Sequence, residues 1–344
     1  MFRLFNAAVK RPPSSSFLTL GTAVLAVSFA PIFIRLSETE LGPNGAVLNR
    51  MLVFFLVFGF GRFLSQSSTV SQRAPLKSTP PSIERPTHIT PRKLVLLLGT
   101  GAISIASLGL WSASLQYTTV AKSMLLNNLT PIFTTLGSWL LFSKRFERQF
   151  LVGVAIALTG AIGIGLEDLH SSDGLLIGDI YALLSAVFLS AYLLLIERLR
   201  CWFSATTIVL WRCGVGSTLL VPIVWITEGQ LVPTTDIAIV AALGMGLVSE
   251  GLGQRLLADC MDRLSSSFVS LAMLVEPVVS ALLAWALFSE AVEPSTWLGF
   301  AVVLSGIYLA QASGSAVQSV PSNDVDKDFE EIVEQQERQL ETVV

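Results

Sequence analysis

One glutamate lies inside a long apolar stretch, where a carboxylate is costly and therefore informative. Glu276 stands about 11 residues into the low-charge stretch 265–288, roughly 16 Å along a helix and close to the midplane of a membrane. Pro277 follows it, and because proline removes a helix hydrogen bond it predicts a kink with a free carbonyl nearby. Such a carboxylate can bind a solute ammonium group, bind a proton, or form a structural salt bridge with an arginine.

Two arginines lie in similar stretches, each six or seven residues from an end and thus roughly 10 Å deep. Arg50 and Arg212 match each other at a spacing of 162 residues, together with Val47/Val209 and Leu48/Leu210. Each can snorkel to the interface, line a cavity, or pair with Glu250 or Glu276. Glu250 can in turn pair with Arg255 or Arg212, or contact a solute. We expect the two arginines to set the potential of an interior cavity.

Neutral polar groups occur at the depth of Glu276 in the other half of the chain. Pro131 is the repeat partner of Pro277, and it follows Asn127, Asn128 and Thr130. We expect both prolines to kink their helices and the two asparagines to face the same cavity.

Aromatic residues add candidates with weaker support. Trp111, Tyr117 and Tyr181 suit contact with organic solutes, but aromatic residues near the ends of membrane spans also form interfacial belts. Lys122 and Arg35 lie near span ends and are expected to be interface anchors.

Composition excludes several classes of protein. Of 344 residues, 52% are hydrophobic and 14% charged, and the mean hydropathy is +0.66. This composition is much more apolar and less charged than that of a soluble domain. A net charge of -3 gives no basic footprint for nucleic acid. His88 and His170 fall in loops, and no metal-ligand spacing, cofactor motif or nucleophile-base set is visible, so we predict no enzyme. Cys201, Cys213 and Cys260 form no disulfide pattern and are predicted to be buried.

Low-charge stretches of membrane-spanning length recur along the chain and predict an all-α polytopic membrane protein. Ten transmembrane helices are expected, near 17–36, 44–64, 93–113, 118–142, 150–166, 176–196, 205–226, 237–257, 265–288 and 295–312. Polar segments flank them: an N-terminus over 1–16, a disordered loop over 65–92 and an acidic tail over 313–344.

The positive charges predict the orientation. All but four of the 22 Lys and Arg residues fall on one side if both termini are cytoplasmic, and the exceptions lie within or at the ends of spans. The loops on the other side carry acids instead. Both termini are therefore predicted to be cytoplasmic.

An internal repeat divides the spans into two sets of five. Residues 125–160 and 271–306 share twelve identities at a constant shift of 146, among them Trp139/Trp285 and Gly153/Gly299. Because five is odd, the second copy enters the membrane in the opposite direction, which predicts inverted repeats over 17–166 and 176–312. Inverted repeats are a recurring plan of secondary transporters that work by alternating access.

Several segments also resemble a known family. AVSFAPIFIRLS, LLNNLTPIFTTLGSWLLFS with GVAIALTGAIGIG, and LAMLVEPVVSALLAWALFSE with LGFAVVLSGIYLA are similar to the two EamA-type halves of the drug/metabolite transporter superfamily, over about 15–312. The resemblance implies a ten-helix transporter of small organic solutes, often outward, through a cavity between the halves.

The sequence as a whole predicts a secondary transporter of metabolites or amino acids in a bacterial inner membrane. Its expected partners are the lipid bilayer, a small organic solute and a coupled proton, with no cofactor. Either a monomer or a homo-oligomer fits the sequence. The alternative is a membrane scaffold or regulatory protein that recruits partners through the acidic tail.

Overall fold

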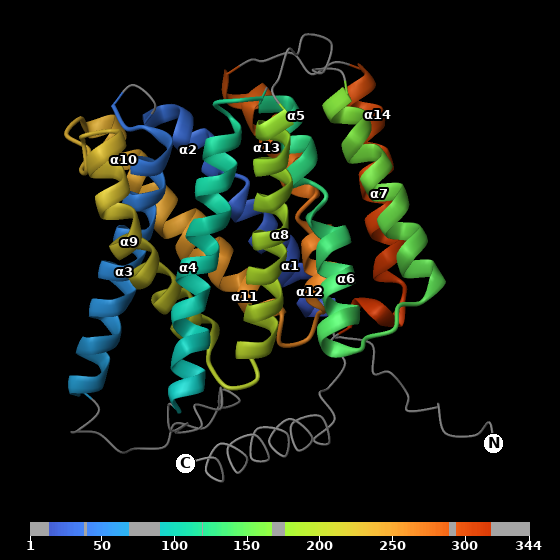
Figure 1. Cartoon of the computed structure of the whole chain (residues 1–344), viewed down its shortest axis with the longest axis horizontal. Helices are drawn as coiled ribbons and strands as arrows, with labels where there is room; N and C mark the ends of the chain where they lie inside the picture. Colours follow the sequence, from blue (N-terminus) through green and yellow to red (C-terminus); the bar gives the residue numbers. More distant parts are fainter. Residues whose placement is uncertain are drawn as a thin grey trace, which may run out of the picture.

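The chain forms a bundle of helices that stand side by side (Figure 1). The structure is a computed structural model that describes residues 14–37, 40–68, 90–118, 120–166, 176–288 and 294–317. The first half contains α1 Ser14–Val27, α2 Ala30–Ser37, α3 Pro43–Ser68, α4 Pro91–Ser114, α5 Val120–Asn127, α6 Thr130–Phe142 and α7 Arg148–Leu166. The second half contains α8 Leu176–Leu199, α9 Ala205–Thr227, α10 Asp236–Gly244, the π-helix η2 Met245–Gln254, α11 Arg255–Cys260, α12 Ser266–Ala272, α13 Val275–Phe288, α14 Pro294–Gln311 and the 3-10 turn η3 Gly314–Ala316. The all-α prediction is confirmed.

Among the described residues, seven helical stretches are long and apolar enough to cross a membrane. Shorter apolar helices cover Arg148–Gly163 and Trp297–Gln311, and helix occurs in every one of the ten ranges expected to span. Large apolar side chains also face outward, including Leu18, Leu141 and Ile226 at 74%, 70% and 81% exposure. Such a surface suits lipid. The polytopic membrane fold is confirmed, whereas the count of ten crossings stays a prediction. Residues 1–13, 69–89 and 318–344, which hold most of the predicted terminal segments and loop, lie outside the described ranges.

Three helical stretches are interrupted shortly before a proline. The interruptions lie at residues 28–29, 128–129 and 273–274, ahead of Pro31, Pro131 and Pro277. Proline cannot donate to the carbonyl four residues earlier, so that carbonyl needs another donor. Thr130 Oγ1 donates to the Asn127 carbonyl at 2.7 Å, and the Glu276 N–H donates to the Met273 carbonyl at 2.9 Å. The interruptions before Pro131 and Pro277 thus end one helix and start the next without leaving that carbonyl unpaired.

Helices α7 and α14 pack closely against each other in opposite directions (Figure 1). An added Cβ at Gly306 would lie 2.4 Å from the Ala157 nitrogen and 2.6 Å from the Gly153 oxygen, and one at Gly160 would lie 3.0 Å from the Gly299 oxygen. Because only hydrogen occupies these positions, the two backbones touch, as small residues permit in membrane helices. Gly153 and Gly299 are repeat partners, as are Gly160 and Gly306, so both halves use equivalent residues at this contact.

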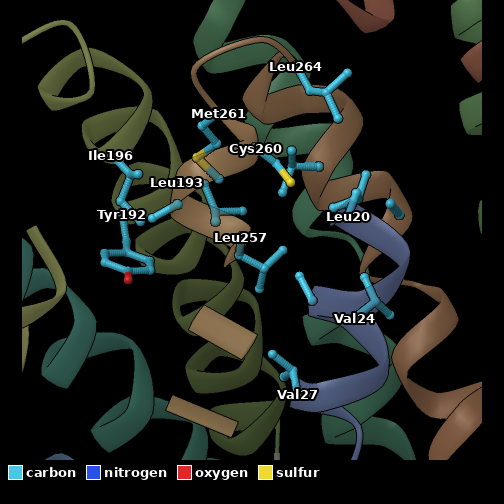
Figure 2. Packing of buried hydrophobic residues seen from close by; sticks show 14 of the residues in the cluster. Leu20, Val24, Val27, Tyr192, Leu193, Ile196, Leu257, Cys260, Met261 and Leu264 are labelled. Carbon is cyan, nitrogen blue, oxygen red and sulfur yellow. The ribbon is translucent and has the colours of Figure 1, made fainter. Parts of the chain in front are cut away.

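The buried core joins the two halves. Figure 2 shows side chains of α1, α8 and α11 meeting, among them Leu20, Val24, Leu193, Leu257 and Cys260. Within lipid such packing stabilises mainly through close contact rather than by removal of water.

One part of the cysteine prediction is wrong. Cys213 and Cys260 are buried, but Cys201 is exposed. It lies in the turn after α8, beyond the apolar helix, and the apolar flanks in the sequence do not reveal that the helix has already ended.

Candidate functional site

Two arginines and a glutamate from distant parts of the sequence meet inside the bundle. Arg50 on α3 lies with its Nε 3.2 Å from Glu250 Oε2, and Arg212 on α9 pairs through Nη1 with Glu250 Oε1. The Glu250 side chain is fully buried, and those of Arg50 and Arg212 are 11% and 5% exposed. Both arginines therefore pair with Glu250. Within this cluster, the internal repeat relates the two arginines to each other.

Arg212 has further contacts that hold it in place. Its Nε donates to Ser104 Oγ on α4 at 2.9 Å, and its guanidinium lies 5.0 Å from the centre of the Tyr192 ring on α8. Cys213 Sγ donates to Glu250 Oε1 at 3.4 Å. Sequence reasoning missed Ser104, Tyr192 and Cys213. A signal existed for Ser104, because its repeat partner is Ser249, the neighbour of Glu250.

Glu250 projects from a π-helix of ten residues, Met245–Gln254. π-Helical turns are rare and are frequently found at functional sites. Glycines let this wider turn approach its neighbours: an added Cβ at Gly246 would lie 3.1 Å from the Arg50 carbonyl oxygen, and one at Gly253 would lie 3.0 Å from the Val27 nitrogen. The glycine-rich segment thus serves close helix packing.

Several buried polar atoms around this cluster have no hydrogen-bond partner among the described residues. They are Arg50 Nε, Glu250 Oε2, Tyr192 Oη and Ser249 Oγ. The close approach of Arg50 to Glu250 is therefore an ion pair without hydrogen-bond geometry. Buried polar atoms in proteins are normally paired, so a group of unpaired ones points to water or a ligand.

Glu276 lies beside the interruption at 273–274, in the first turn of α13. It is partly exposed, and no described residue gives its carboxylate a hydrogen bond or an ion pair. The ion pairs of Arg50 and Arg212 are with Glu250. Glu276 is thus no part of the ion pairs of the cluster.

The other predicted site residues lie in two further places. Asn127 and Asn128 are partly buried at the interruption between α5 and α6, where Asn127 Oδ1 accepts a hydrogen bond from Ser185 Oγ at 3.4 Å. Trp111 is partly buried on α4, and its indole N–H has no partner among the described atoms. It is seven residues beyond Ser104, or roughly 10 Å along the helix.

A separate polar group forms near the start of α8. Lys122 Nζ lies 2.6 Å from Asp179 Oδ2, and Tyr117, which is 41% exposed, lies 6.1 Å from the ring of Tyr181. Asp179 and Tyr192 are thirteen residues apart on α8, about 20 Å. Tyr117 and Lys122 are therefore remote from the arginine cluster.

The fold and the buried charges define an integral membrane protein with a polar interior. Comparison with known proteins identifies it further: residues 14–166 and 176–311 each match the EamA-like transporter family, and the chain belongs to that family. The double match supports a transporter role.

Two curated relatives carry transporter names. An uncharacterized transporter of Archaeoglobus fulgidus is 24% identical over 214 residues, which are 62% of this chain and 75% of that protein. The uncharacterized transporter YetK of Bacillus subtilis is 24% identical over 203 residues, 56% of this chain and 60% of that one. The crystal structure of another protein has a TM-score of 0.69 at 18% identity over 87% of this chain and 98% of that one. That likeness shows the fold.

Proposed function

We propose that the protein is a secondary transporter that exports small anionic or zwitterionic organic solutes, of metabolite or amino-acid type, by alternating access between its inverted repeats. The observation that carries this proposal is the buried cluster of Arg50, Arg212 and Glu250 with its unpaired polar atoms. Export rests on the family resemblance.

The charges of the cluster favour a solute that carries a negative group. Two guanidinium groups share one carboxylate, so the cluster has an excess of positive charge. Charged groups within the bilayer are costly and mark solute or ion pathways. Glu276 supplies a separate negative charge that can hold a solute ammonium group or a coupled proton.

Polar contacts between the two halves occur at both ends of the bundle, as alternating access requires. At the end predicted to be cytoplasmic, Lys144 after α6 pairs with Glu197 on α8, which also accepts hydrogen bonds from the backbone and hydroxyl of Ser266 on α12. These contacts link the loop of one half to two helices of the other. Their breakage would open a path to the interior from that end.

The opposite end has matching contacts. Glu228 at the end of α9 accepts hydrogen bonds from the Asn44 and Gly45 N–H groups at 2.9 and 2.8 Å. Glu40 before α3 accepts from the N–H groups of Thr234 and Thr235 before α10. Each carboxylate caps a helix start in the other half, where the helix dipole favours a negative charge. Because contacts join the two halves at both ends of the bundle, the conformation fits an occluded state of the transport cycle.

The experiment is transport by the purified protein in liposomes. Radiolabelled amino acids, organic acids, nucleotides, sugars and cationic drugs are tested for counterflow, with empty liposomes as the control. We expect exchange of an anionic or zwitterionic solute that is recovered chemically unchanged. A protein that binds and exchanges none of the panel would contradict the proposal, and so would preference for a cationic drug. An imposed pH gradient in the same liposomes tests proton coupling.

Truncation separates transport from the scaffold alternative. The cut belongs after Val317, because Ser313 and Gly314 bond to Glu147 between α6 and α7. A chain that lacks residues 318–344 should transport normally if the helical bundle alone carries out transport. A cellular phenotype that disappears while transport persists would favour the scaffold function.

We also propose that both termini of the chain lie in the cytoplasm of a bacterial cell. Cysteines introduced at residue 10 and at residue 330, in a chain with Cys201→Ser, should resist a membrane-impermeant thiol reagent in whole cells and react in inside-out vesicles. Labelling of either site in whole cells would reverse this topology.

A further inference from the structure

A groove of about 700 Å³ opens on the outer surface of the bundle between α6 and α7. These helices follow each other in the sequence, yet α7 packs closely against α14 (Figure 1). Ile132, Leu136 and Trp139 line the groove from α6, and Leu151 and Val154 line it from α7. The three α6 side chains are 43%, 46% and 55% exposed. The groove therefore faces the surroundings of the bundle, outside the buried charge cluster.

The wall of the groove is apolar and asks for no hydrogen bond. Thr135 also lines it, but its Oγ1 donates to the Pro131 carbonyl at 2.7 Å within α6. From Ile132 to Trp139 the wall runs for seven residues, roughly 10 Å along the helix. A hydrocarbon chain matches such a wall, because it fills the space without leaving a polar group unpaired.

One end of the groove carries positive charge. Arg145 lines it from the connection between the helices, three residues beyond the end of α6 at Phe142. Arg148 follows at the start of α7. Both side chains are exposed, and no carboxylate or hydrogen-bond acceptor contacts either of them within the part of the chain that the structure describes. Two guanidinium groups are thus available to an anion.

The other charged groups of this connection have partners elsewhere. Lys144 pairs with Glu197 on α8. The Glu147 carboxylate accepts hydrogen bonds from Ser313 Oγ at 2.7 Å and from the Gly314 N–H at 3.1 Å. Among the described residues, it forms no ion pair with Arg145 or Arg148. The connection therefore presents an uncompensated positive charge beside the groove.

We propose that the groove between α6 and α7 binds an anionic phospholipid, with an acyl chain along its apolar wall and the phosphate bound by Arg145. Arg148 adds to the attraction. A guanidinium binds phosphate through two parallel N–H donors, and basic pockets between membrane helices on the cytoplasmic side bind anionic head groups. Arg145 lies at the end of the bundle that we predict to be cytoplasmic, so its depth suits a head group. The proposal is independent of the transported solute.

The internal repeat supplies a comparison within the same chain. Trp285 on α13 is the repeat partner of Trp139, and it is similarly exposed, at 52%. The sequence that follows Phe288 reads SEAVEP, which contains no Lys or Arg. The second half thus repeats the outward-facing tryptophan without the positive charges. We therefore expect the preference for an anionic lipid at Trp139 and not at Trp285.

The test is quenching of tryptophan fluorescence by phospholipids that carry bromine on their acyl chains. The full chain, purified free of native lipid, is titrated in mixed micelles with brominated phosphatidylglycerol or with brominated phosphatidylcholine, which has no net charge. The signal of Trp139 is the difference between the native chain and Trp139→Phe, and Trp285→Phe gives the matched control. We expect half-maximal quenching of Trp139 at about a 30-fold lower mole fraction of phosphatidylglycerol than of phosphatidylcholine, or about 5-fold for each arginine.

Charge variants then identify the residues responsible. Arg145→Gln should reduce the preference about 5-fold, and Arg145→Gln with Arg148→Gln should abolish it. Both side chains are exposed, so these variants should keep the native unfolding midpoint. Arg263→Gln removes another exposed arginine, between α11 and α12, and should leave the preference unchanged. Free glycerol phosphate in excess should not restore the fluorescence of Trp139.

Four results would overturn the proposal. Equal quenching of Trp139 by the two lipids would show that the groove meets only bulk lipid, and an equal preference at Trp285 would show that the arginines do not cause it. Displacement by glycerol phosphate would indicate a site for phosphate alone. Protection of Trp139 from both lipids in a chain that elutes as a dimer would show that a second copy fills the groove.

Discussion

Replacement of Glu250 by glutamine tests whether the buried cluster holds the helices together. Within the described ranges, Glu250 is the one carboxylate in ion-pair contact with both Arg50 and Arg212, and it is fully buried. Its loss leaves two guanidinium groups inside the protein without a counter-charge. Removal of one partner from a buried ion pair costs about 3–5 kcal/mol. At about 2–4 °C per kcal/mol, the factor for a domain of 150–250 residues, we expect the midpoint to fall by about 6–20 °C.

Glu276→Gln is the matched control, because it removes a carboxylate that has no ion-pair partner among the described residues. We expect its midpoint to be unchanged or slightly raised. The native cysteines provide the assay: Cys213 and Cys260 are buried and become reactive to a thiol-specific dye on unfolding, and Cys201→Ser removes the exposed thiol. A native-like midpoint for Glu250→Gln, or an equal fall for Glu276→Gln, would refute the reasoning.

Three further predictions concern the rest of the bundle. Gly306→Ala forces a methyl group to within 2.4 Å of backbone on α7 and should cost about 1–3 kcal/mol in the same assay, whereas Gly163→Ala, which meets nothing within 4 Å, should not destabilise. Glu197→Gln removes the ion pair with Lys144 and should speed the labelling of buried Cys213 in inside-out vesicles; an unchanged rate would show that this contact does not close the interior. Hydrogen bonds from Thr234 and Thr235 lower the pKa of Glu40 from 4.5 to about 2, so the stability that this carboxylate contributes is complete above pH 4.5 and disappears as the pH falls to about 2. The midpoint of Glu40→Gln should therefore fall less than that of the native chain over this pH interval, and parallel curves would contradict it.

The sequence allows the helical elements to be predicted, because length and apolarity decide membrane helices. The interruptions at 128–129 and 273–274 also follow from a local cause, the missing N–H of Pro131 and Pro277. The exposure of Cys201 could not be predicted from the sequence. It depends on where α8 ends, and the apolar residues on both sides of Cys201 do not mark that end.

The composition of the site depends on contacts between distant helices. Pairing of Arg50 and Arg212 with Glu250 is among the alternatives that the sequence leaves open, since it requires only opposite charges at similar depth. Tyr192 carries no such signal, because its place over Arg212 depends on the rotation of α8 about its axis. The π-helix around Glu250 is equally hidden, since nothing in an apolar run marks a turn that is one residue wider.

The contact between α7 and α14 has a consequence for the ancestry of the chain. Gly153 and Gly160 on one side meet Gly299 and Gly306 on the other, so repeat-equivalent residues form both faces of one contact. That is the property of an isologous interface, in which two identical subunits are related by a two-fold axis. A polypeptide of half this length, inserted in both orientations, would have had the same surface on each copy. The present chain then has the surfaces expected of a fused dimer, in which the contacts around Arg50 and Arg212 differ while the α7–α14 contact is built from equivalent residues.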